Sequence, residues 1–212
     1  MILYTYFRSS AAFRVRIALN LKNLAAEQRS IHLLNKQNRL PEYKSINPQG
    51  FVPYLIDGDI RLAQSLAIIE YLDECYPDPP LLPADAVERA QTRAIAQLIA
   101  CDIHPVNNKR ILDYLGEDLG VDEERRKKWY RHWVEDGFAA LERVLQEHAG
   151  RGGFCIGDMP TLADVCLVPQ VFNAQRFKCD MSAYPRIAAV HERCMKLTAF
   201  DAAQPSKQPD AV

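Results

Sequence analysis

The sequence predicts two domains of different class, an α/β domain with a mixed sheet followed by an all-helical domain. Segments with strand and helix character alternate over residues 1–76. Four prolines then fall within residues 77–83, where a helix cannot continue. Beyond them, apolar residues recur at helical spacing. We therefore expect one domain at residues 1–82 and a second at residues 83–212.

The first domain is expected to open on a strand at residues 2–7, which are apolar and aromatic. In the helix that follows, at residues 11–24, Phe13, Ile17 and Leu21 recur every four residues and form an apolar stripe. The other expected elements are a strand at residues 27–33, a loop with room for a short helix around residues 35–43, a hairpin turning at Asp57-Gly58 and a helix opened by Gln64-Ser65. The resulting order is β-α-β-(α)-β-β-α.

Three helices are expected in the second domain. Apolar spacing places one around residues 95–106, interrupted by Pro105, and another at residues 129–145, ended by Gly150. The third, at residues 162–171, is apolar nearly throughout and should be buried. Thr161, with Asp164 three residues later, predicts a capping box at its start, because each side chain can accept a hydrogen bond from a backbone N–H of the first turn.

Composition excludes several classes of function. The formal net charge of −1 gives no global basic field for nucleic acid or an anionic membrane, so an anionic substrate would need local arginines. No 18-residue apolar run predicts a membrane span, and the N-terminus lacks the features of a signal peptide. The six cysteines include no Cys-x-x-Cys, and no His/Cys pair has zinc-site spacing. We expect reduced thiols in the cytoplasm and no metal site.

The first candidate site is the strand-to-helix junction Arg8-Ser9-Ser10-Ala11. A helix N-terminus presents free N–H groups and a partial positive charge, and it can stabilise a thiolate or a carboxylate. A serine hydroxyl there can also donate to an anion. The alternative is a serine that only caps the helix.

Two further candidates lie in the same domain. Pro53 stands just before a strand, which makes Val52-Pro53 a candidate cis bond that would turn the Val52 backbone outward toward an extended peptide; a trans turn proline is the alternative. Ser65 starts a helix, so that it could bind a carboxylate or simply act as a cap. Together the three candidates describe a pocket for a short anionic thiol peptide such as glutathione.

The chain also resembles the zeta class of glutathione transferases over nearly its whole length. The matching segments are residues 6–19, Asn47-Pro48, Val52-Pro53, residues 64–72, 164–170 and 173–177, and the tail Gln208-Pro209-Asp210. Ala11 stands where the family signature has a cysteine, and Phe13 where it has a tryptophan. The resemblance implies a thioredoxin-like N-terminal domain and a helical C-terminal domain that completes the substrate site.

The resemblance implies a cytoplasmic glutathione-dependent cis–trans isomerase, with maleylpyruvate as the expected dicarboxylic keto-acid substrate. The glutathione thiolate would add reversibly to the C=C bond and leave unchanged, so that no protein cysteine is needed at Ala11. The alternatives are a maleylacetoacetate isomerase, a general glutathione transferase and a non-catalytic binding module on the same fold. A homodimer is also implied.

The resemblance further implies the site residues. Ser9, in preference to Ser10, would stabilise the thiolate, and Arg8, Arg110 and Arg176 would bind the substrate and its developing charge. Glutathione contacts would come from Ser9, Ser10, Ala11, Asn38, Gln49, Val52, Pro53, Gln64, Ser65, Asp102, His104, Asn108, Lys109 and Arg110. His104 and Asn108 would share a helix face if the helix persists past Pro105, and Arg110 would then need a kink or a long reach to join them. Asp102 would reach a partner subunit's glutathione, or else be a plain surface acid.

Overall fold

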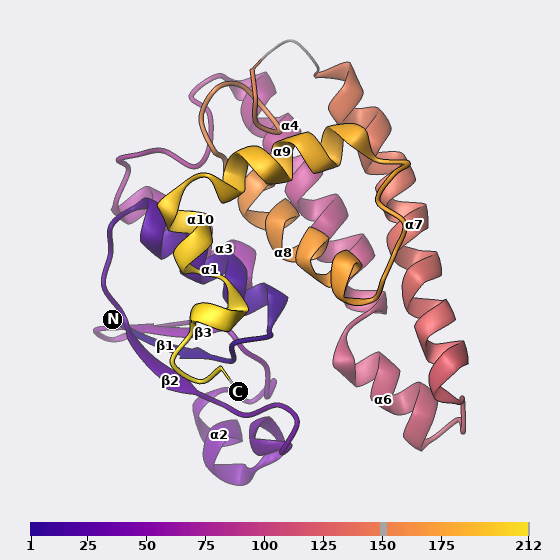
Figure 1. Cartoon of the computed structure of the whole chain (residues 1–212). Helices are drawn as coiled ribbons and strands as arrows, with labels where there is room; N and C mark the ends of the chain where they lie inside the picture. The colour runs from indigo at the N-terminus through magenta and orange to yellow at the C-terminus, as the bar shows by residue number, and fades with distance from the viewer. Residues whose placement is uncertain (149–151, 212) are drawn as a thin grey trace. The chain divides into compact units, whose positions relative to one another are not determined.

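The computed structural model describes residues 1–148 and 152–211, which form two compact units. The first unit comprises residues 1–81 together with the C-terminal segment from residue 196, and the second comprises residues 82–195. The sequence assigned that C-terminal segment to the helical domain at residues 83–212, whereas its contacts group it with the first unit. The segment packs on the first unit, where α10 (Thr198–Ala202) lies against α1 (Ser10–Leu21) and Asn20 Nδ2 donates to Ala199 O at 2.9 Å (Figure 1).

The first unit is built on a mixed sheet, as the sequence predicted, and its four strands have the spatial order β2-β1-β3-β4. β1 pairs parallel with β2 and antiparallel with β3, which pairs antiparallel with β4. The strands are β1 (Ile2–Thr5), β2 (Glu27–Ser30), β3 (Tyr54–Asp57) and β4 (Ile60–Ala63), and the helical elements besides α1 and α10 are η1 (Gln37–Arg39), α2 (Pro41–Ile46), α3 (Ser65–Cys75) and η3 (Pro205–Lys207).

β1 and β2 are both shorter than expected. β1 stops at Thr5 because the chain turns there: Ser9 N donates to Tyr6 O at 2.9 Å and leads directly into α1. β2 ends at Ser30, although Ile31 N still donates to Thr5 O at 2.8 Å. The early turn brings Arg8 and Ser9 to the carboxyl end of β1.

A buried ion pair joins the helices that cover this sheet. Lys22, with a fully buried side chain, lies 2.7 Å from Asp73 of α3. Its ammonium also donates to Tyr76 O at 2.6 Å and Pro79 O at 2.9 Å. The start of the proline-rich segment is thereby tied to the first unit.

The second unit is helical. Its elements are α4 (Ala86–Gln97), a π-helical segment η2 (Leu98–Ile103), α5 (His104–Val106), α6 (Lys109–Glu117), α7 (Glu123–Glu147), α8 (Leu162–Arg176) and α9 (Pro185–Met195). α8 is buried along most of its length, as predicted. The capping box is confirmed, since Thr161 N donates to Asp164 Oδ2 at 2.8 Å and the Thr161 side chain accepts from the backbone N–H of Asp164. Gly150, expected to end α7, lies outside the described residues.

The expected interruption at Pro105 is wrong. The helix changes to a π-helix over η2, before the proline, and continues through α5 to Val106. In an α-helix the proline ring would clash with the carbonyl four residues earlier, whereas a wider π-turn gives it room. The helix ends at Val106 instead, with Asn107 as its C-cap.

Candidate active site

Ser9 occupies the N-cap of α1. Its Oγ accepts a hydrogen bond from Ala12 N at 3.2 Å, and a serine hydroxyl has one proton of its own to donate as well. Ser10 is buried as the first residue of α1, and Ala11 is half-buried beside it. The junction therefore offers a hydroxyl and first-turn N–H groups, with no cysteine thiol at residues 8–11.

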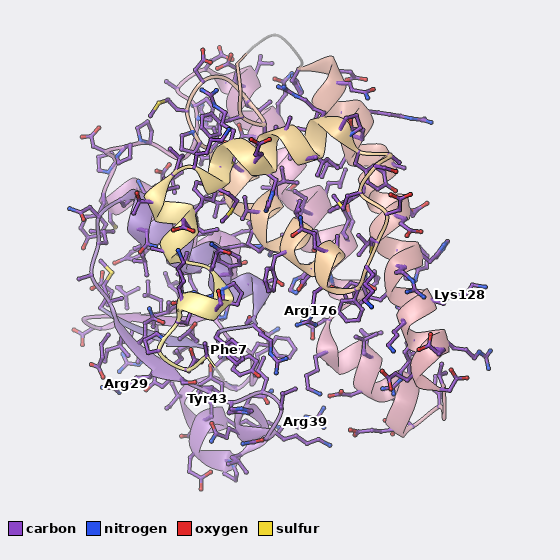
Figure 2. All side chains as sticks on the ribbon, viewed as in Figure 1. Phe7, Arg29, Arg39, Tyr43, Lys128 and Arg176 are labelled. Atoms are coloured by element: carbon purple, nitrogen blue, oxygen red, sulfur yellow. The ribbon has the colours of Figure 1, made fainter. Side chains whose placement is uncertain are left out.

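Arg8 is half-buried next to this N-terminus. Its guanidinium carbon lies 5.0 Å from the centre of the Phe7 ring, and its Nη2 donates to Tyr6 OH at 3.3 Å. Phe7 follows the end of β1 (Figure 2). A fixed cation thus stands within one residue of Ser9.

The loop before β3 is held by contacts to its carbonyls. Phe51 O accepts from Tyr43 OH at 2.6 Å and from Asn47 Nδ2 at 2.8 Å. Asn38 Nδ2 donates to Gly50 O at 2.8 Å. Gly50 has a φ of +67°, and a Cβ there would lie 2.7 Å from Asn38 O, so that only glycine fits. Asn38 therefore supports the loop, and Tyr43 and Asn47 are supports that sequence reasoning missed.

This loop presents the backbone of Val52. The Val52-Pro53 bond, which the sequence left open, is cis. Both side chains are buried, and within the described part of the chain no hydrogen bond involves the Val52 backbone. Its N–H and C=O can therefore pair with an extended peptide, as a sheet edge would.

The start of α3 lies beside that loop. Gln64 Nε2 donates to Gln49 Oε1 at 3.0 Å, which brings these two exposed candidates together. Gln64 has a φ of +71°, a strained conformation for a non-glycine residue that the surrounding structure must hold in place. Ser65 is buried at the first position of α3, where its Oγ accepts from Arg14 Nη1 at 3.3 Å. Arg14 is a further support that sequence reasoning missed.

The remaining candidates lie in the second unit. Asp102 is exposed on η2, and His104 is half-buried on α5. The expectation that His104 and Asn108 share one helix face is wrong, because α5 ends at Val106. Asn108 is the N-cap of α6, where its side chain accepts from Arg110 N at 3.1 Å. The kink that Arg110 required is thus present.

Two contacts fix these short helices on α7. Trp129 Nε1 donates to Val106 O at 2.9 Å, and a Cβ on Gly137 would overlap the Ile103 side chain, so the glycine permits close approach. A second glycine, Gly116 of α6, faces Arg126 in the same way, and a Cβ there would lie 2.6 Å from the guanidinium. Glycines inside helices signal such approaches, although the sequence does not name the partner.

Lys109 and Arg176 have different neighbours: the first forms an ion pair within its own helix, and the second lies over an aromatic ring. Lys109 Nζ lies 2.6 Å from Asp113 within α6. Arg176, which is labelled in Figure 2, is the last residue of α8 and is exposed. Its guanidinium carbon lies 4.9 Å from the centre of the Phe177 ring, and that ring stacks on Tyr130 with 3.5 Å between the ring centres. Burial raises the pKa of Tyr130, and the charge of Arg176 opposes that rise. The guanidinium therefore rests on a rigid aromatic pair.

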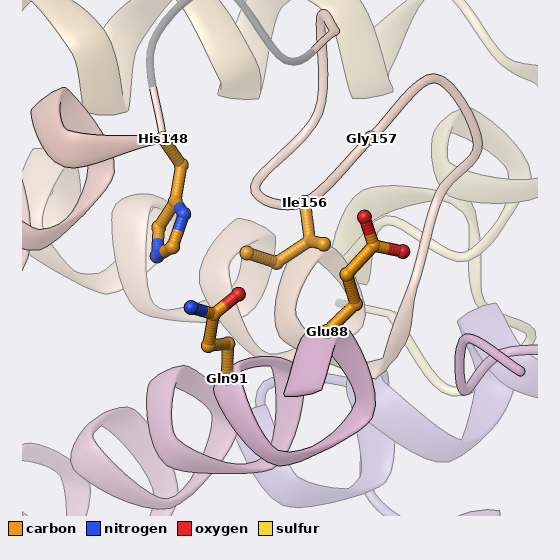
Figure 3. Close-up of a pocket in the computed structure, with 5 residues that line it drawn as sticks. All are labelled: Glu88, Gln91, His148, Ile156 and Gly157. Atoms are coloured by element: carbon orange, nitrogen blue, oxygen red, sulfur yellow. The ribbon is translucent and has the colours of Figure 1, made fainter. Parts of the chain in front are cut away.

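A separate small cavity lies within the second unit (Figure 3). Glu88 and Gln91 reach it from α4, His148 from the end of α7, and Ile156 and Gly157 from the loop before α8. Its volume of about 10 Å³ is room for one water molecule. This cavity is too small for an organic substrate.

Within the described residues, no group of three or more His, Cys, Asp or Glu side chains could hold a metal ion. All six cysteines are free thiols, four of them buried. In the same part of the chain no helix is both long and apolar enough to span a membrane. The candidate chemistry thus rests on hydroxyls, amides, backbone groups and arginines.

Comparison with known proteins gives matches to two domain families. Residues 1–74 match the glutathione S-transferase N-terminal domain, and residues 127–193 match the glutathione S-transferase C-terminal domain. A probable maleylacetoacetate isomerase of Vibrio cholerae is 52% identical over 213 residues, covering 100% of this chain and 98% of the relative.

Two solved structures superpose on the whole chain. One is the holo structure of a maleylpyruvate isomerase, described as a bacterial zeta-class glutathione S-transferase, with 47% identity, a TM-score of 0.98 and 100% of both chains covered. The other is a maleylacetoacetate isomerase of Methylobacterium extorquens with bound malonate and glutathione, with 41% identity, a TM-score of 0.97 and again 100% of both chains covered.

Proposed function

Because the chain belongs to the zeta class of the glutathione S-transferase family, we propose that it is a glutathione-dependent cis–trans isomerase that converts maleylpyruvate to fumarylpyruvate. One observation carries the proposal. Ser9 at the N-terminus of α1, the Val52 backbone, which forms no hydrogen bond in the described structure, and the start of α3 at Ser65 all belong to one compact unit. These are the groups that a thiol, a peptide backbone and a carboxylate require.

The donor set fits glutathione. Val52 offers an N–H and a C=O that form no hydrogen bond in the described structure, and these can pair with the cysteinyl backbone of the peptide. Gln64, Ser65 and the free N–H groups of α3 can hold its γ-glutamyl carboxylate. His104 and Asn108 carry groups that can donate to its glycyl carboxylate, with Lys109 and Arg110 next to them.

Bound glutathione supplies a thiolate nucleophile that turnover regenerates. A free thiol has a pKa near ~8.5, so it must be stabilised as the anion at neutral pH. Ser9 can do so by donating its hydroxyl proton, aided by the partial charge at the N-terminus of α1. Ala11 offers no competing thiol.

Three arginines carry the other half of the chemistry. Arg8, Arg110 and Arg176 present planar forks that suit carboxylates. They would hold the two carboxylates of the keto acid and stabilise the negative charge that develops on its carbonyl oxygen. An apolar electrophile would make little use of them, which ranks a general transferase lower.

Maleylacetoacetate is the second candidate substrate, since the Vibrio relative carries that name. The two keto acids differ mainly in chain length. The test is a side-by-side comparison of kcat/KM on both, with glutathione supplied. A higher value for maleylpyruvate supports our assignment, and a higher value for maleylacetoacetate reverses it.

The other two alternatives need separate assays. Rapid conjugation of a neutral aryl halide, with no turnover of either keto acid, would establish a general transferase. Absence of glutathione binding in calorimetry would favour a non-catalytic module.

We also propose that the enzyme is a cytoplasmic homodimer. Free thiols throughout the described chain suit a reducing compartment. The exposed carboxylate of Asp102 on η2 is accessible to a second copy and can pair with the amine of the glutathione bound there. Sedimentation equilibrium tests the dimer, and a monomeric mass at assay concentration would contradict it.

A further inference from the structure

The backbone of Phe7 is held on both sides by groups from elsewhere in the chain. Its N–H donates to Asp210 Oδ2 at 3.0 Å, across 203 residues of sequence. Its C=O accepts from Arg16 Nη2 at 3.0 Å. Phe7 leads directly to Arg8 and Ser9, so these two bonds fix the point from which the β1–α1 junction departs.

Arg16 connects that junction to the C-terminal segment. The residue is 2% exposed, and its guanidinium donates to Thr5 Oγ1 at 3.1 Å as well as to Phe7 O. Its Nε and Nη2 both donate to Ala203 O at 3.2 Å. Burial lowers the pKa of Arg16 to about 10 while Asp210 opposes the shift, so the guanidinium stays charged at neutral pH.

The segment that carries Asp210 is itself fixed. Gln208 Nε2 donates to Ala202 O and Gln204 O, both at 2.9 Å. Asp210 Oδ2 also accepts from Ser30 Oγ of β2 at 2.8 Å. The carboxylate therefore approaches Phe7 from a segment braced against α10 and the edge strand.

A displacement of Phe7 would reach the site directly. The Phe7 ring lies under the Arg8 guanidinium at 5.0 Å, and the Ser9 N–H bonds back to Tyr6 O at 2.9 Å. The turn is thus too short to absorb a shift at its start. Such preorganisation matters because a donor helps a developing charge only when it is already in place.

We propose that Asp210 and Arg16 are positioning residues, which hold Phe7 so that Ser9 and Arg8 face the thiol and the substrate. The proposal rests on the proposed function. It gives the C-terminal tail Gln208-Pro209-Asp210 a role in catalysis, although none of its residues is assigned a contact with glutathione or the keto acid.

The test compares Asp210→Ala with Asp210→Asn and Ser30→Ala. Asp210→Ala removes the acceptor for Phe7 N–H, and Asp210→Asn keeps an oxygen acceptor without the charge. Ser30→Ala is the matched control, because it removes the other hydrogen bond to the same carboxylate oxygen. The full-length protein is used throughout.

Five quantities are measured: amide hydrogen exchange at residues 7–9 without ligand, the pKa of the bound glutathione thiol from thiolate absorbance, kcat on the keto acid, the Kd for glutathione and the Tm. For Asp210→Ala we expect the rate of amide exchange at residues 7–9 to rise by about tenfold and kcat to fall by about tenfold. The thiol pKa should rise by about half a unit, while the Kd for glutathione stays within about threefold. Asp210→Asn should fall between Asp210→Ala and the unmodified enzyme, and Ser30→Ala should match the latter.

The outcomes separate the two proposals. A lower Tm for Asp210→Ala with unchanged thiol pKa and kcat would mean that the tail only stabilises the fold, and it would overturn the inference. Equal damage from Ser30→Ala would place the effect at β2 and overturn it too. If the unmodified protein bound no glutathione, the proposed function would fail. Independently of that result, unchanged amide exchange at residues 7–9 in Asp210→Ala would refute the claim that Asp210 fixes the Phe7 backbone.

Discussion

The two units of the molecule present their candidate residues in different ways. In the first, backbone groups at Phe7, Gly50 and Phe51 are fixed by side-chain donors and acceptors at 2.6–3.0 Å. In the second, Asp102, Arg110 and Arg176 are exposed, and α6 contains no fully buried residue. The candidate groups of the first unit thus depend mainly on an immobilised backbone, and those of the second mainly on exposed side chains.

This contrast has a functional consequence. Glutathione is common to the catalytic alternatives considered, so a fixed backbone suits it. The second substrate differs between these alternatives. An exposed arginine on α6, which has no fully buried residue, can be substituted without disturbing the first unit. Substitutions in the two units should therefore affect different kinetic constants.

The largest effect is expected at Ser9. Ser9→Ala removes the hydroxyl donor at the N-terminus of α1, and kcat should fall by about 100-fold because a hydrogen bond to a charged group is lost. The pKa of the bound thiol should rise with it. Ser10→Ala tests the neighbouring hydroxyl and should lower kcat by only a few-fold, because Ser9 is the preferred donor to the thiolate. An unchanged thiol pKa in Ser9→Ala would remove Ser9 from this role.

Arg176 should show the opposite pattern. Arg176→Ala leaves the first unit intact, so the Kd for glutathione should hold within about twofold while the KM for the keto acid rises by about tenfold through loss of a charge-assisted contact. Steady-state kinetics and calorimetry measure the two constants. Lys128→Ala, which removes an exposed charge from α7, is the control, and unchanged kinetics in Arg176→Ala would exclude Arg176 from the site.

A smaller effect should follow from loosening α6. In Gly116→Ala the new Cβ would displace the Arg126 guanidinium, which donates to Leu112 O at 3.4 Å. Alanine also favours a helix by about 1 kcal/mol over glycine, so stability should change little. The KM for the keto acid should rise by about threefold as the start of α6 shifts. Arg126→Gln should raise the KM for the keto acid by a similar factor without adding a Cβ. A fall in glutathione affinity instead would contradict the expectation that the two units affect different kinetic constants.

The smallest effect is expected from Tyr43→Phe. Phe51 O keeps its bond from Asn47, so the loop should stay in place at a cost of about 1 kcal/mol, or a Tm lower by about 2–4 °C. The Kd for glutathione should change by less than about twofold. Asn47→Ala, which removes the other donor to Phe51 O, serves as the comparison. A large loss of glutathione affinity in Tyr43→Phe would show that the bond from Asn47 alone cannot hold the loop in place.

Local chemistry in the sequence predicted part of this arrangement well. The Thr161–Asp164 capping box is confirmed, and so is the hairpin, although its two turn residues are Gly58, at a φ of +57°, and Asp59, because Asp57 still pairs with Ile60. Ser9 caps α1 as expected. Each of these depends on residues within four positions of one another, where side-chain chemistry determines the backbone.

Longer connections could not be predicted from the sequence. Nothing in the residues around Asp210 indicates that its carboxylate binds Phe7 N–H, because a contact over that separation depends on the completed fold. The π-helix at residues 98–103 keeps the apolar spacing of an α-helix, so the sequence favours Pro105 as the break. The family resemblance implied the candidate site residues, and the structure shows which side chains support those in the first unit.

The central claim is that glutathione acts as a recycled nucleophile. The most direct measurement follows maleylpyruvate isomerisation with glutathione far below the substrate concentration, while free thiol is titrated throughout. The account predicts complete conversion to the trans isomer, an undiminished thiol titre and no reaction without glutathione. Conversion that stops at one equivalent of glutathione, or that proceeds equally well in its absence, would contradict it.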